Sequence, residues 1–449
     1  MSAALSRYVV HPSSDLHGEA SIPGDKSISH RALMLGSLAE GDTHIHDFLE
    51  SEDCLATLVA LRQLGVRIDG PSSGHVTVRG PGAARLQQAA GALDMGNAGT
   101  AMRLFMGLLA SQPFDSKLIG DASLMRRPME RVAVPLRLMG ADITTVDGRP
   151  PVRIRGGRAL AAIDYELPVP SAQVKSAILL AALRADGRTR IVEPAPSRDH
   201  TERMLSAFGV EVLHSDRAIA LQGGQSLHAT RVQVPGDFSS AAFFIVAGCL
   251  AARQGLMLRG IGLNPTRTGL LGLLQEMGAD IRIRPWDHER SGSDAASEPV
   301  ADIEVYASEL QGIKVAQSAV PLAIDELPVL FIAAACAQGE TLVRGALELR
   351  VKESDRLAAM AAGLARLGIE VELLNDGIWI RGASGGFSGG AIDSHGDHRI
   401  AMAFAVAAAR ARAPIEIRDV SSVATSFPNF LASAGAVGLQ IELCTPPPS

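Results

Sequence analysis

Cationic and hydroxyl side chains recur where the sequence predicts that helices begin. The first such phrase, Gly24-Asp25-Lys26-Ser27, is followed by Arg31 and leads into an apolar helix. The free N–H groups and the dipole of a helix N-terminus favour an anion, and lysine and arginine add positive charge there. The glycine spacing of a Walker A loop is missing, so the phrase does not indicate an ATPase. Ordinary N-capping by the serines, beside solvated charges, is the structural alternative.

Arginines dominate the other phrases of this kind. Arg127 stands before Pro128, which suits the first turn of a helix, and Arg198 stands where a further helix is expected to begin. A guanidinium group can grip phosphate or carboxylate through two parallel hydrogen bonds. Exposed charged turns are the alternative interpretation.

The densest group of charges runs from Arg350 to Arg356. At helical spacing Lys352 and Arg356 share a face, and Glu353 can pair with Arg356. A surface helix with ion pairs is the alternative. Arg399 adds a further cation at the start of an apolar run.

Neutral and acidic groups are interleaved with these cations. Ser171 and Gln173 offer hydrogen bonds that suit the hydroxyl groups of a ligand, and Gly99 lies among small residues that allow close approach to backbone N–H groups. Asp325 and Glu326 precede an apolar helix, which one of them can cap. Cations and acids of these kinds from both halves of the chain predict a cleft for anionic, phosphate-bearing small molecules, with acid and base groups beside them.

Histidines and cysteines do not form a metal-binding pattern. His395 and His398 flank Asp397, but no third histidine or cysteine stands at ligand spacing. We expect His200 to be a structural histidine, and the four widely spaced cysteines to be reduced. No metal is therefore expected. We also expect no organic cofactor.

The composition limits the class of protein. The chain has 449 residues and a net charge of −6, which predicts two or three domains and argues against a nucleic-acid partner. No run of about 18 apolar residues and no targeting segment is recognisable, so we expect a monomeric cytoplasmic protein without a membrane partner. Lysine is rare, with five in the chain, so a lysine within a motif is noticeable.

A repeated phrase organises the chain: an apolar helix end, a glycine, then an alternating strand. A left-handed glycine is the usual way to end a helix before a strand. Upstream of each copy, a β-rich stretch runs into a polar turn and an amphipathic helix, so six copies of one α/β unit are predicted. The six glycines are Gly65, Gly140, Gly209, Gly278, Gly368 and Gly438.

The six units fall into two groups of three, because Pro23-Gly24-Asp25 and the phrase after it return as Pro235-Gly236-Asp237. We place the first domain at 20–233 and the second at 1–19 with 234–449, with the active site in the cleft between them. The strand Tyr8-Val9-Val10 is expected to join the second domain. Residues 286–300 predict a surface loop in the fourth unit.

Eight phrases together resemble the 5-enolpyruvylshikimate-3-phosphate synthase family, from about Ile22 to Pro428. Eight such motifs in the family's order are highly specific. The resemblance implies an α/β fold, a two-domain inside-out α/β barrel of six βαβαββ units, three per domain, joined by a double crossover. The phrases are PGDKSISHRA, GNAGTAMR, RRPM, PSAQVKSA, SRDHTERM, DELPVL, RVKESDRL and DHRIAM.

The resemblance also implies which residues hold the two substrates. Those expected around 3-phosphoshikimate are Lys26, Ser27, Arg31, Ser171, Ala172, Gln173, Arg198, Asp325 and Lys352. Those expected around phosphoenolpyruvate are Lys26, Gly99, Arg127, Gln173, Arg356 and Arg399.

The chemistry implied is addition followed by elimination. The 5-hydroxyl of 3-phosphoshikimate attacks C2 of phosphoenolpyruvate while C3 gains a proton, and the tetrahedral intermediate then loses phosphate. Asp325 is the candidate base toward the hydroxyl, with Glu353 and Lys26 near the C3 proton; the sequence leaves open which group serves each step. The arginines would neutralise the developing charge.

Two positions depart from well-known members of the family. Thr425 stands where many members carry lysine, and Leu104 stands where many carry proline, as in the subgroup associated with glyphosate tolerance. Gly99 keeps the small residue that leaves room for this inhibitor, so we expect sensitivity.

Two other functions compete with this interpretation. UDP-N-acetylglucosamine enolpyruvyl transferase has a similar fold and uses a cysteine on a mobile loop, whereas the only cysteine in the first half here, Cys54, follows Glu52-Asp53 in a turn. A phosphate-binding repeat protein without catalysis is the second rival.

Overall fold

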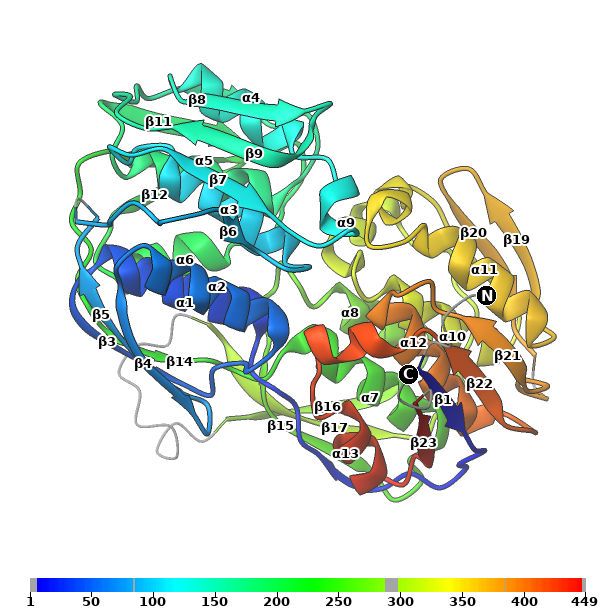
Figure 1. Cartoon of the computed structure of the whole chain (residues 1–449). Coiled ribbons are helices and arrows are strands. Elements are labelled where there is room, and N and C mark those ends of the chain that lie inside the picture. Colours follow the sequence, from blue (N-terminus) through cyan, green and yellow to red (C-terminus); the bar gives the residue numbers. More distant parts are fainter. Residues whose placement is uncertain (1–5, 84, 287–297, 384, 446–449) are drawn as a thin grey trace. The chain divides into compact units, whose positions relative to one another are not determined.

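The computed structural model describes residues 6–83, 85–286, 298–383 and 385–445 (Figure 1). The chain divides into two compact units, which we treat separately. The first unit comprises Gly24–Pro235 with His288–Glu298, and the second comprises Met1–Pro23, Gly236–Asp287 and Pro299–Ser449.

The first unit is built from helices and short strands in alternation. Its helices are α1 (Lys26–Leu38), α2 (Glu52–Gln63), α3 (Gly99–Leu109), η1 (Leu124–Arg126), α4 (Glu130–Leu138), α5 (Ala172–Ala182) and α6 (His200–Ala207). Its strands are β3 (Glu40–His46), β4 (Arg67–Ser72), β5 (His75–Pro81), β6 (Leu93–Asp94), β7 (Ser116–Ile119), β8 (Asp142–Val146), β9 (Arg149–Arg155), β10 (Asp164–Glu166), β11 (Arg188–Val192), β12 (Val212–Ser215), β13 (Ala218–Gln222) and β14 (Arg231–Gln233).

The second unit follows the same alternation. Its helices are α7 (Phe238–Ala251), α8 (Gly269–Glu276), η3 (Gln317–Ala319), α9 (Val320–Ala323), α10 (Leu327–Cys336), η4 (Leu347–Val351), α11 (Arg356–Arg366), α12 (His398–Ala407), η5 (Ala408–Arg410), η6 (Ser421–Thr425) and α13 (Phe430–Ala436). Its strands are β1 (Arg7–Val10), β2 (Gly18–Ala20), β15 (Leu256–Gly262), β16 (Asp280–Pro285), β17 (Val300–Tyr306), β18 (Glu340–Val343), β19 (Glu370–Leu374), β20 (Gly377–Arg381), β21 (Gly390–Asp393), β22 (Ile415–Arg418) and β23 (Ile441–Cys444).

One sheet pattern recurs through both units, as the predicted repeat requires. Each of five four-stranded sheets has one parallel pair followed by two antiparallel neighbours, for example β14-β3-β5-β4. In β18-β20-β19 the parallel partner is reduced to isolated bridges, one of them between Lys314 and Leu342. The other four sheets are β6-β7-β9-β8, β10-β11-β13-β12, β16-β17-β15-β2 and β21-β22-β1-β23. The predicted two-domain α/β fold of six related units is confirmed.

The six repeat glycines end helices as predicted. All have a positive φ, between 83° at Gly209 and 99° at Gly140, and each stands between the end of a helix and the start of a strand. A side chain there would strain the left-handed backbone, so glycine is the residue that permits the turn.

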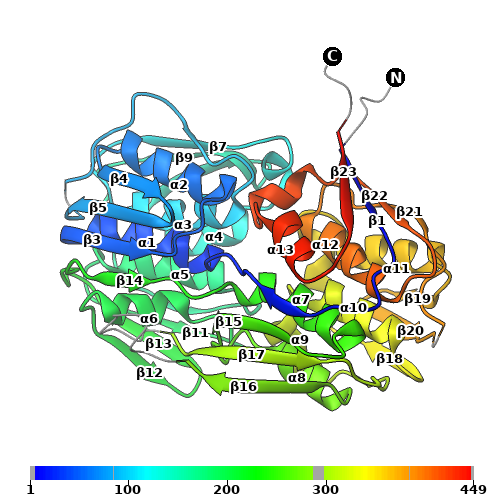
Figure 2. The same ribbon diagram turned by 90° about the horizontal axis from the view of Figure 1, so that it is seen from below.

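Strands exchanged along the chain complete the sheets. The predicted joining of Tyr8–Val10 to the second half is confirmed, because β1 pairs with both β22 and β23 (Figure 2). Of the loop predicted at 286–300, residues 287–297 lie outside the described residues. Glu298 belongs to the first unit, not to the fourth repeat in which the prediction placed it.

Three local predictions at helix starts are wrong. Aspartates, not the serines after them, cap α1 and α7: the Asp25 carboxylate accepts from the N–H of Ile28, and the Asp237 carboxylate accepts from those of Ser239 and Ser240. The ionised carboxylate is the stronger acceptor and complements the helix dipole. Pro128 lies before α4 rather than in its first turn.

The third error concerns Arg350 to Arg356, which is not one helix. The 3-10 helix η4 ends at Val351, and α11 begins only at Arg356, where the Asp355 side chain caps it by accepting from Ala358 N–H. The four residues between the two helices, 352–355, are therefore not helical, and their side chains do not follow the spacing of a continuous helix.

Each unit has its own hydrophobic core, built on apolar helices. All residues of α7 are buried, and α3 packs along α5 so closely that a Cβ on Gly107 would lie inside van der Waals contact with the Ala177 backbone. No single helix among the described residues is long and apolar enough to cross a membrane, although one bent pair, Gln317–Ala323 with Leu327–Cys336, passes that test by length and composition.

We predict that Gly107→Ala destabilises the first unit by about 1–3 kcal/mol or more, because the neighbouring backbone has no room to move. Chemical denaturation followed by circular dichroism measures the change. Gly272→Ala is the matched control: Gly272 is exposed within α8, a Cβ added there would meet nothing within 4 Å, and alanine should stabilise by roughly 0.5–1 kcal/mol. Equal effects of the two substitutions would contradict the packing argument.

Candidate active site

The start of α1 carries the first cation of the site. Asp25 is buried and fixes the first turn, and Lys26 extends from it with its Nζ 2.9 Å from Asp53 Oδ2. Lys26 retains about a fifth of its side-chain exposure, 21%, so its ammonium group is paired and still accessible to a ligand. Ser27 follows and offers its carbonyl oxygen to Arg31.

Arg31 is buried without a carboxylate partner. Its Nε donates to Thr201 Oγ1 at 2.6 Å, one Nη donates to the Ser27 carbonyl at 2.9 Å, and the other donates to Ser176 Oγ at 2.9 Å. No acidic oxygen of the described residues lies within the 4.0 Å of an ion pair. Burial lowers the pKa of Arg31 to about 10, and the more distant carboxylates of Glu202, Asp25 and Glu298 offset this effect only in part. Such a buried cation is a ready site for an anion.

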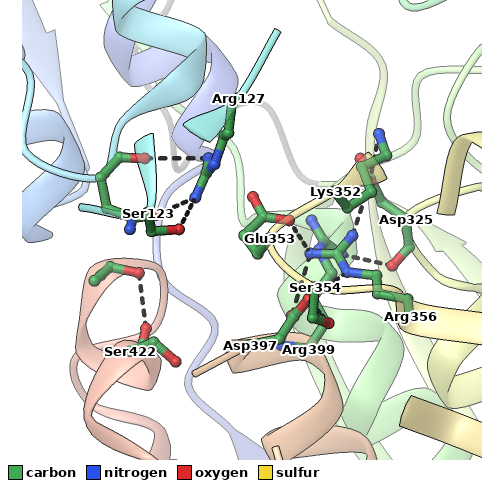
Figure 3. Close-up of polar contacts among 12 residues, drawn as sticks. Ser123, Arg127, Asp325, Lys352, Glu353, Ser354, Arg356, Asp397, Arg399 and Ser422 are labelled. Atoms are coloured by element: carbon green, nitrogen blue, oxygen red, sulfur yellow. Dashed lines mark hydrogen bonds and ion pairs between the residues drawn. The ribbon is translucent and has the colours of Figure 1, made fainter. Parts of the chain in front are cut away.

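Arg127 lies against the start of α3 (Figure 3). Its guanidinium group donates to Asn97, both to the carbonyl and to the side-chain oxygen, and to Ser123 Oγ at 3.3 Å. A Cβ on Gly99 would lie 3.0 Å from Arg127 Nη1 and 3.3 Å from Arg103 Nη1. Glycine at this helix start therefore keeps the approach to two guanidinium groups open.

The start of α5 carries the neutral groups. Ser171 caps the helix by accepting from Val174 N–H, and Ala172 is its first residue. The Gln173 amide is held at both ends, accepting from Arg103 Nη1 at 2.7 Å and donating to Thr100 Oγ1 at 3.0 Å. Sequence reasoning assigned no role to Arg103, although it stands in a motif quoted for the family.

A buried ion cluster supports the segment that carries Arg198. Lys175 Nζ lies 2.8 Å from Glu193 Oε2 and 2.7 Å from Glu202 Oε1, and it also donates to the Ser197 carbonyl. Burial alone would lower the pKa of Lys175, but the two carboxylates raise it above its ordinary value, so the amine stays charged. The sequence marked this residue by the rarity of lysine and by its place in the motif PSAQVKSA, but neither signal indicated its two carboxylate partners.

His200 is a buried structural histidine, as predicted. Its Nδ1 lies 2.6 Å from Glu298 Oε1, and both side chains are excluded from solvent. The partner glutamate comes from far along the chain, so its identity is visible only in the structure.

Arg356 is the centre of the cluster in the second unit (Figure 3). Its Nε lies 2.8 Å from Asp397 Oδ2, one Nη lies 3.3 Å from Asp325 Oδ1, and the other lies 2.5 Å from Glu353 Oε2. Burial alone would lower the pKa of Arg356, but Asp397, Glu353 and Asp325 together raise it above its ordinary value. One permanently charged group therefore fixes three carboxylates.

Lys352 joins the same cluster from the segment before α11. Its Nζ lies 3.5 Å from Asp325 Oδ1, so Asp325 faces two cations. Ser354 donates to Asp397 at 3.0 Å. The pairing predicted between Glu353 and Arg356 is confirmed, although it forms from an irregular segment rather than along a helix.

Arg399 begins α12 beside the start of α10. Its Nη1 donates to the Asp325 carbonyl at 2.9 Å and lies 3.6 Å from Glu326 Oε1. Glu326 is buried and accepts from Ser239, which in turn accepts from Arg267 at 2.8 Å. The N-cap residue Asp397 also accepts from the Arg399 backbone N–H, so this arginine is held from three sides.

The two positions that depart from the family have structural roles of their own. Leu104 is fully buried in α3, and Thr425 ends η6 with its hydroxyl donating to the Ser422 carbonyl. Thr425 supplies a neutral hydroxyl where many family members have an ammonium group.

The residues predicted for the site thus form one group in each unit. The group of the first unit is Lys26, Ser27, Arg31, Gly99, Arg127, Ser171, Ala172, Gln173 and Arg198. The group of the second unit is Asp325, Lys352, Glu353, Arg356 and Arg399. Within the second group, Lys352, Arg356 and Arg399 contact Asp325 directly, and Glu353 is linked to it through Arg356.

The described residues contain no group of three or more His, Cys, Asp or Glu side chains that could hold a metal ion. Cys54 is buried beside the Lys26 carbonyl, and burial raises the pKa of its thiol far above the ordinary value. A thiol in that state is a poor nucleophile, unlike the loop cysteine of the rival transferase.

Comparison with known proteins identifies the family. Residues 10–433 match the family model described as EPSP synthase (3-phosphoshikimate 1-carboxyvinyltransferase). The chain is 54% identical to the 3-phosphoshikimate 1-carboxyvinyltransferase of Methylococcus capsulatus, covering 97% of this chain and 98% of the relative, and 56% identical to that of Halorhodospira halophila, covering 97% of each. An EPSP synthase structure from Acinetobacter baumannii matches with a TM-score of 0.87 and 50% identity, covering 98% of this chain and 100% of that one. The chain belongs to the EPSP synthase family.

Proposed function

We propose that this chain transfers the enolpyruvyl group of phosphoenolpyruvate to the 5-hydroxyl of 3-phosphoshikimate and releases phosphate. The family match over residues 10–433 and the names of relatives more than 50% identical support this activity. The same findings favour it over the UDP-N-acetylglucosamine enolpyruvyl transferase. The reaction is an addition followed by an elimination, and the protein needs no metal or organic cofactor for it.

The observation that carries the proposal is the pair of carboxylates, Asp325 and Glu353, held by one buried arginine. The reaction removes a proton from a hydroxyl group and delivers a proton to C3 of phosphoenolpyruvate, so it needs a base and an acid in fixed positions. Arg356 contacts both carboxylates from the same guanidinium group. Its positive charge favours their ionised forms until a substrate changes their surroundings.

We assign the 3-phosphoshikimate site mainly to the first group of residues. The buried guanidinium group of Arg31, whose hydrogen-bond acceptors are neutral, suits the dianionic phosphate of this substrate, together with Lys26, Ser27 and Arg198. Ser171, Ala172 and Gln173 at the start of α5 suit its hydroxyl groups. Asp325 and Lys352 complete the site, with Asp325 as the base toward the 5-hydroxyl.

We assign phosphoenolpyruvate, which carries a carboxylate and a phosphate, to the arginines of both groups. Arg127 with Gly99 and Gln173, and Arg356 with Arg399, would surround it, and Lys26 would serve both substrates. These cations neutralise the charge that develops as the ketal phosphate forms and breaks down. Glu353 and Lys26 are the proposed groups for the proton at C3.

The proposal also places the enzyme in the cytoplasm as a monomer. The net charge of −6 does not suit a polyanionic partner such as nucleic acid. Sedimentation of the purified protein measures the oligomeric state.

We expect Glu353→Gln to lower kcat by about 10²- to 10⁴-fold, because an amide cannot transfer the proton. The affinity for 3-phosphoshikimate should change by less than about threefold, since the amide keeps the shape of the side chain. Phosphate release measures turnover, and calorimetry measures binding. Glu372→Gln, on the exposed face of β19, is the control and should behave as the wild type. Unchanged turnover of Glu353→Gln would support a binding protein instead.

We expect Lys26→Met to abolish detectable turnover, because the variant loses a cation shared by both substrates and a candidate proton donor. Methionine fills similar space but removes the ammonium partner of the buried Asp53 carboxylate, so the unfolding midpoint should also fall, and circular dichroism must show that the variant is folded at the assay temperature. Lys314→Met replaces an exposed lysine that is assigned to neither substrate and is the charge-matched control. Product formation from the two substrates, followed by mass spectrometry, distinguishes the outcomes.

We expect sensitivity to glyphosate, and we expect Gly99→Ala to reduce it. A methyl group at Gly99 would press on Arg127 and Arg103 at 3.0 and 3.3 Å, so the KM for phosphoenolpyruvate should also rise. Inhibition curves for both proteins at fixed substrate concentrations test this. Equal inhibition constants would show that this methyl group does not enter the inhibitor site.

A further inference from the structure

Two hydroxyl groups hold the guanidinium group of Arg31. Thr201 Oγ1 accepts from Arg31 Nε at 2.6 Å, and Ser176 Oγ accepts from Nη2 at 2.9 Å. Thr201 and Ser176 are buried, with 1% and 0% exposure, and their oxygens lie 2.7 Å apart. The guanidinium group therefore rests on a pair of neutral oxygens that contact each other.

The direction of each hydrogen bond in this pair follows from the donors present. Ser176 Oγ donates its only proton to the Ala172 carbonyl at 2.6 Å, so it must accept from Thr201. Thr201 then donates to Ser176 and accepts from Arg31. Both hydroxyl protons are thus donated to other groups. Each hydroxyl oxygen can therefore only accept from Arg31.

A second contact fixes the two helices that carry these hydroxyls. Ser176 follows Lys175 on α5, and Thr201 precedes Glu202 on α6; Lys175 and Glu202 form a buried ion pair at 2.7 Å. Consecutive residues of one helix therefore meet consecutive residues of the other. The ion pair sets the spacing at which the hydroxyls meet Arg31.

Neutral acceptors have a different effect on arginine from carboxylates. A carboxylate would orient the guanidinium group and cancel its charge, whereas a hydroxyl orients it and leaves the charge for a ligand. The N–H groups of Arg31 that do not contact Ser27, Thr201 or Ser176 remain for an anion.

We propose that Thr201, with Ser176, is a positioning residue that fixes Arg31 for the phosphate of 3-phosphoshikimate while preserving its charge. The inference rests on the proposed function, because it takes Arg31 as a phosphate ligand. Thr201 itself touches no substrate and acts through Arg31. A defect at Thr201 should therefore weaken one substrate selectively.

The test compares Thr201→Val, which removes the hydroxyl and keeps the shape, with Thr201→Ser, which keeps the hydroxyl. In Thr201→Val we expect the dissociation constant and the KM for 3-phosphoshikimate to rise about 10- to 100-fold, as for a lost hydrogen bond to a charged group. The kcat and the KM for phosphoenolpyruvate should stay within about threefold of wild type, and Thr201→Ser should restore the lost affinity. Calorimetry with 3-phosphoshikimate and steady-state kinetics supply these values.

Ser176→Ala removes the second hydroxyl and is tested in parallel. It should show the same selective loss, so the inference remains testable if Thr201→Val does not fold. Wild-type turnover combined with full 3-phosphoshikimate affinity in the folded Thr201→Val or Ser176→Ala protein would overturn the inference alone. Thr201→Ser as impaired as Thr201→Val would also overturn it. A wild-type protein that neither binds 3-phosphoshikimate nor turns over would overturn the proposed function and the inference with it.

Discussion

A guanidinium group that leaves water must find acceptors, since burying an unmatched charge costs several kcal/mol. The two units of this protein meet that requirement in opposite ways. Arg31 rests on hydroxyl and carbonyl oxygens and keeps its charge, whereas Arg356 contacts three carboxylates. The first arrangement favours an incoming anion, and the second fixes acids and bases. This difference supports the roles that we propose: Arg31 binds an anion of the substrate, whereas Arg356 contacts phosphoenolpyruvate and also fixes Asp325 and Glu353.

The repeat explains why such arginines stand at equivalent places. In each repeat a strand is followed by a turn and a helix. The free N–H groups at the start of that helix point toward the side chains of the turn. Arg127, Arg198 and Arg267 each stand shortly before the second helix of a repeat, and Arg356 begins one. The repeat therefore fixes where the arginine lies, and the side chains around it determine whether it can bind a ligand.

Arg267 shows the effect of those neighbours most clearly. It is buried like Arg31 but lies 2.7 Å from Asp237, which also caps α7, and it donates to Ser239. The Asp237 carboxylate occupies the position beside the Arg267 guanidinium group that an anionic ligand would need. Through Ser239 and Glu326 this arginine instead supports the segment from which Arg399 is held. The same position of the repeat therefore carries a proposed substrate-binding arginine in one repeat and a structural arginine in another.

Local patterns in the chain were sufficient to predict the repeat, the helix-ending glycines and the family. These features depend on local patterns. A left-handed backbone conformation favours glycine, as at Gly65 and its five counterparts, and eight motifs in order identify the family. The same patterns marked Lys26, Arg31, Arg356 and Arg399 as candidate ligands.

The acceptors that these cations meet could not be predicted from local patterns, because they come from distant parts of the chain. Thr201 and Ser176 reach Arg31 from helices 145 residues and more away, and Glu298 reaches His200 across 98 residues. The charge that remains on a buried arginine depends on those distant partners. A local pattern also misassigned the caps of α1 and α7 and the helix at Arg350, because competition between nearby acceptors is settled by three-dimensional geometry.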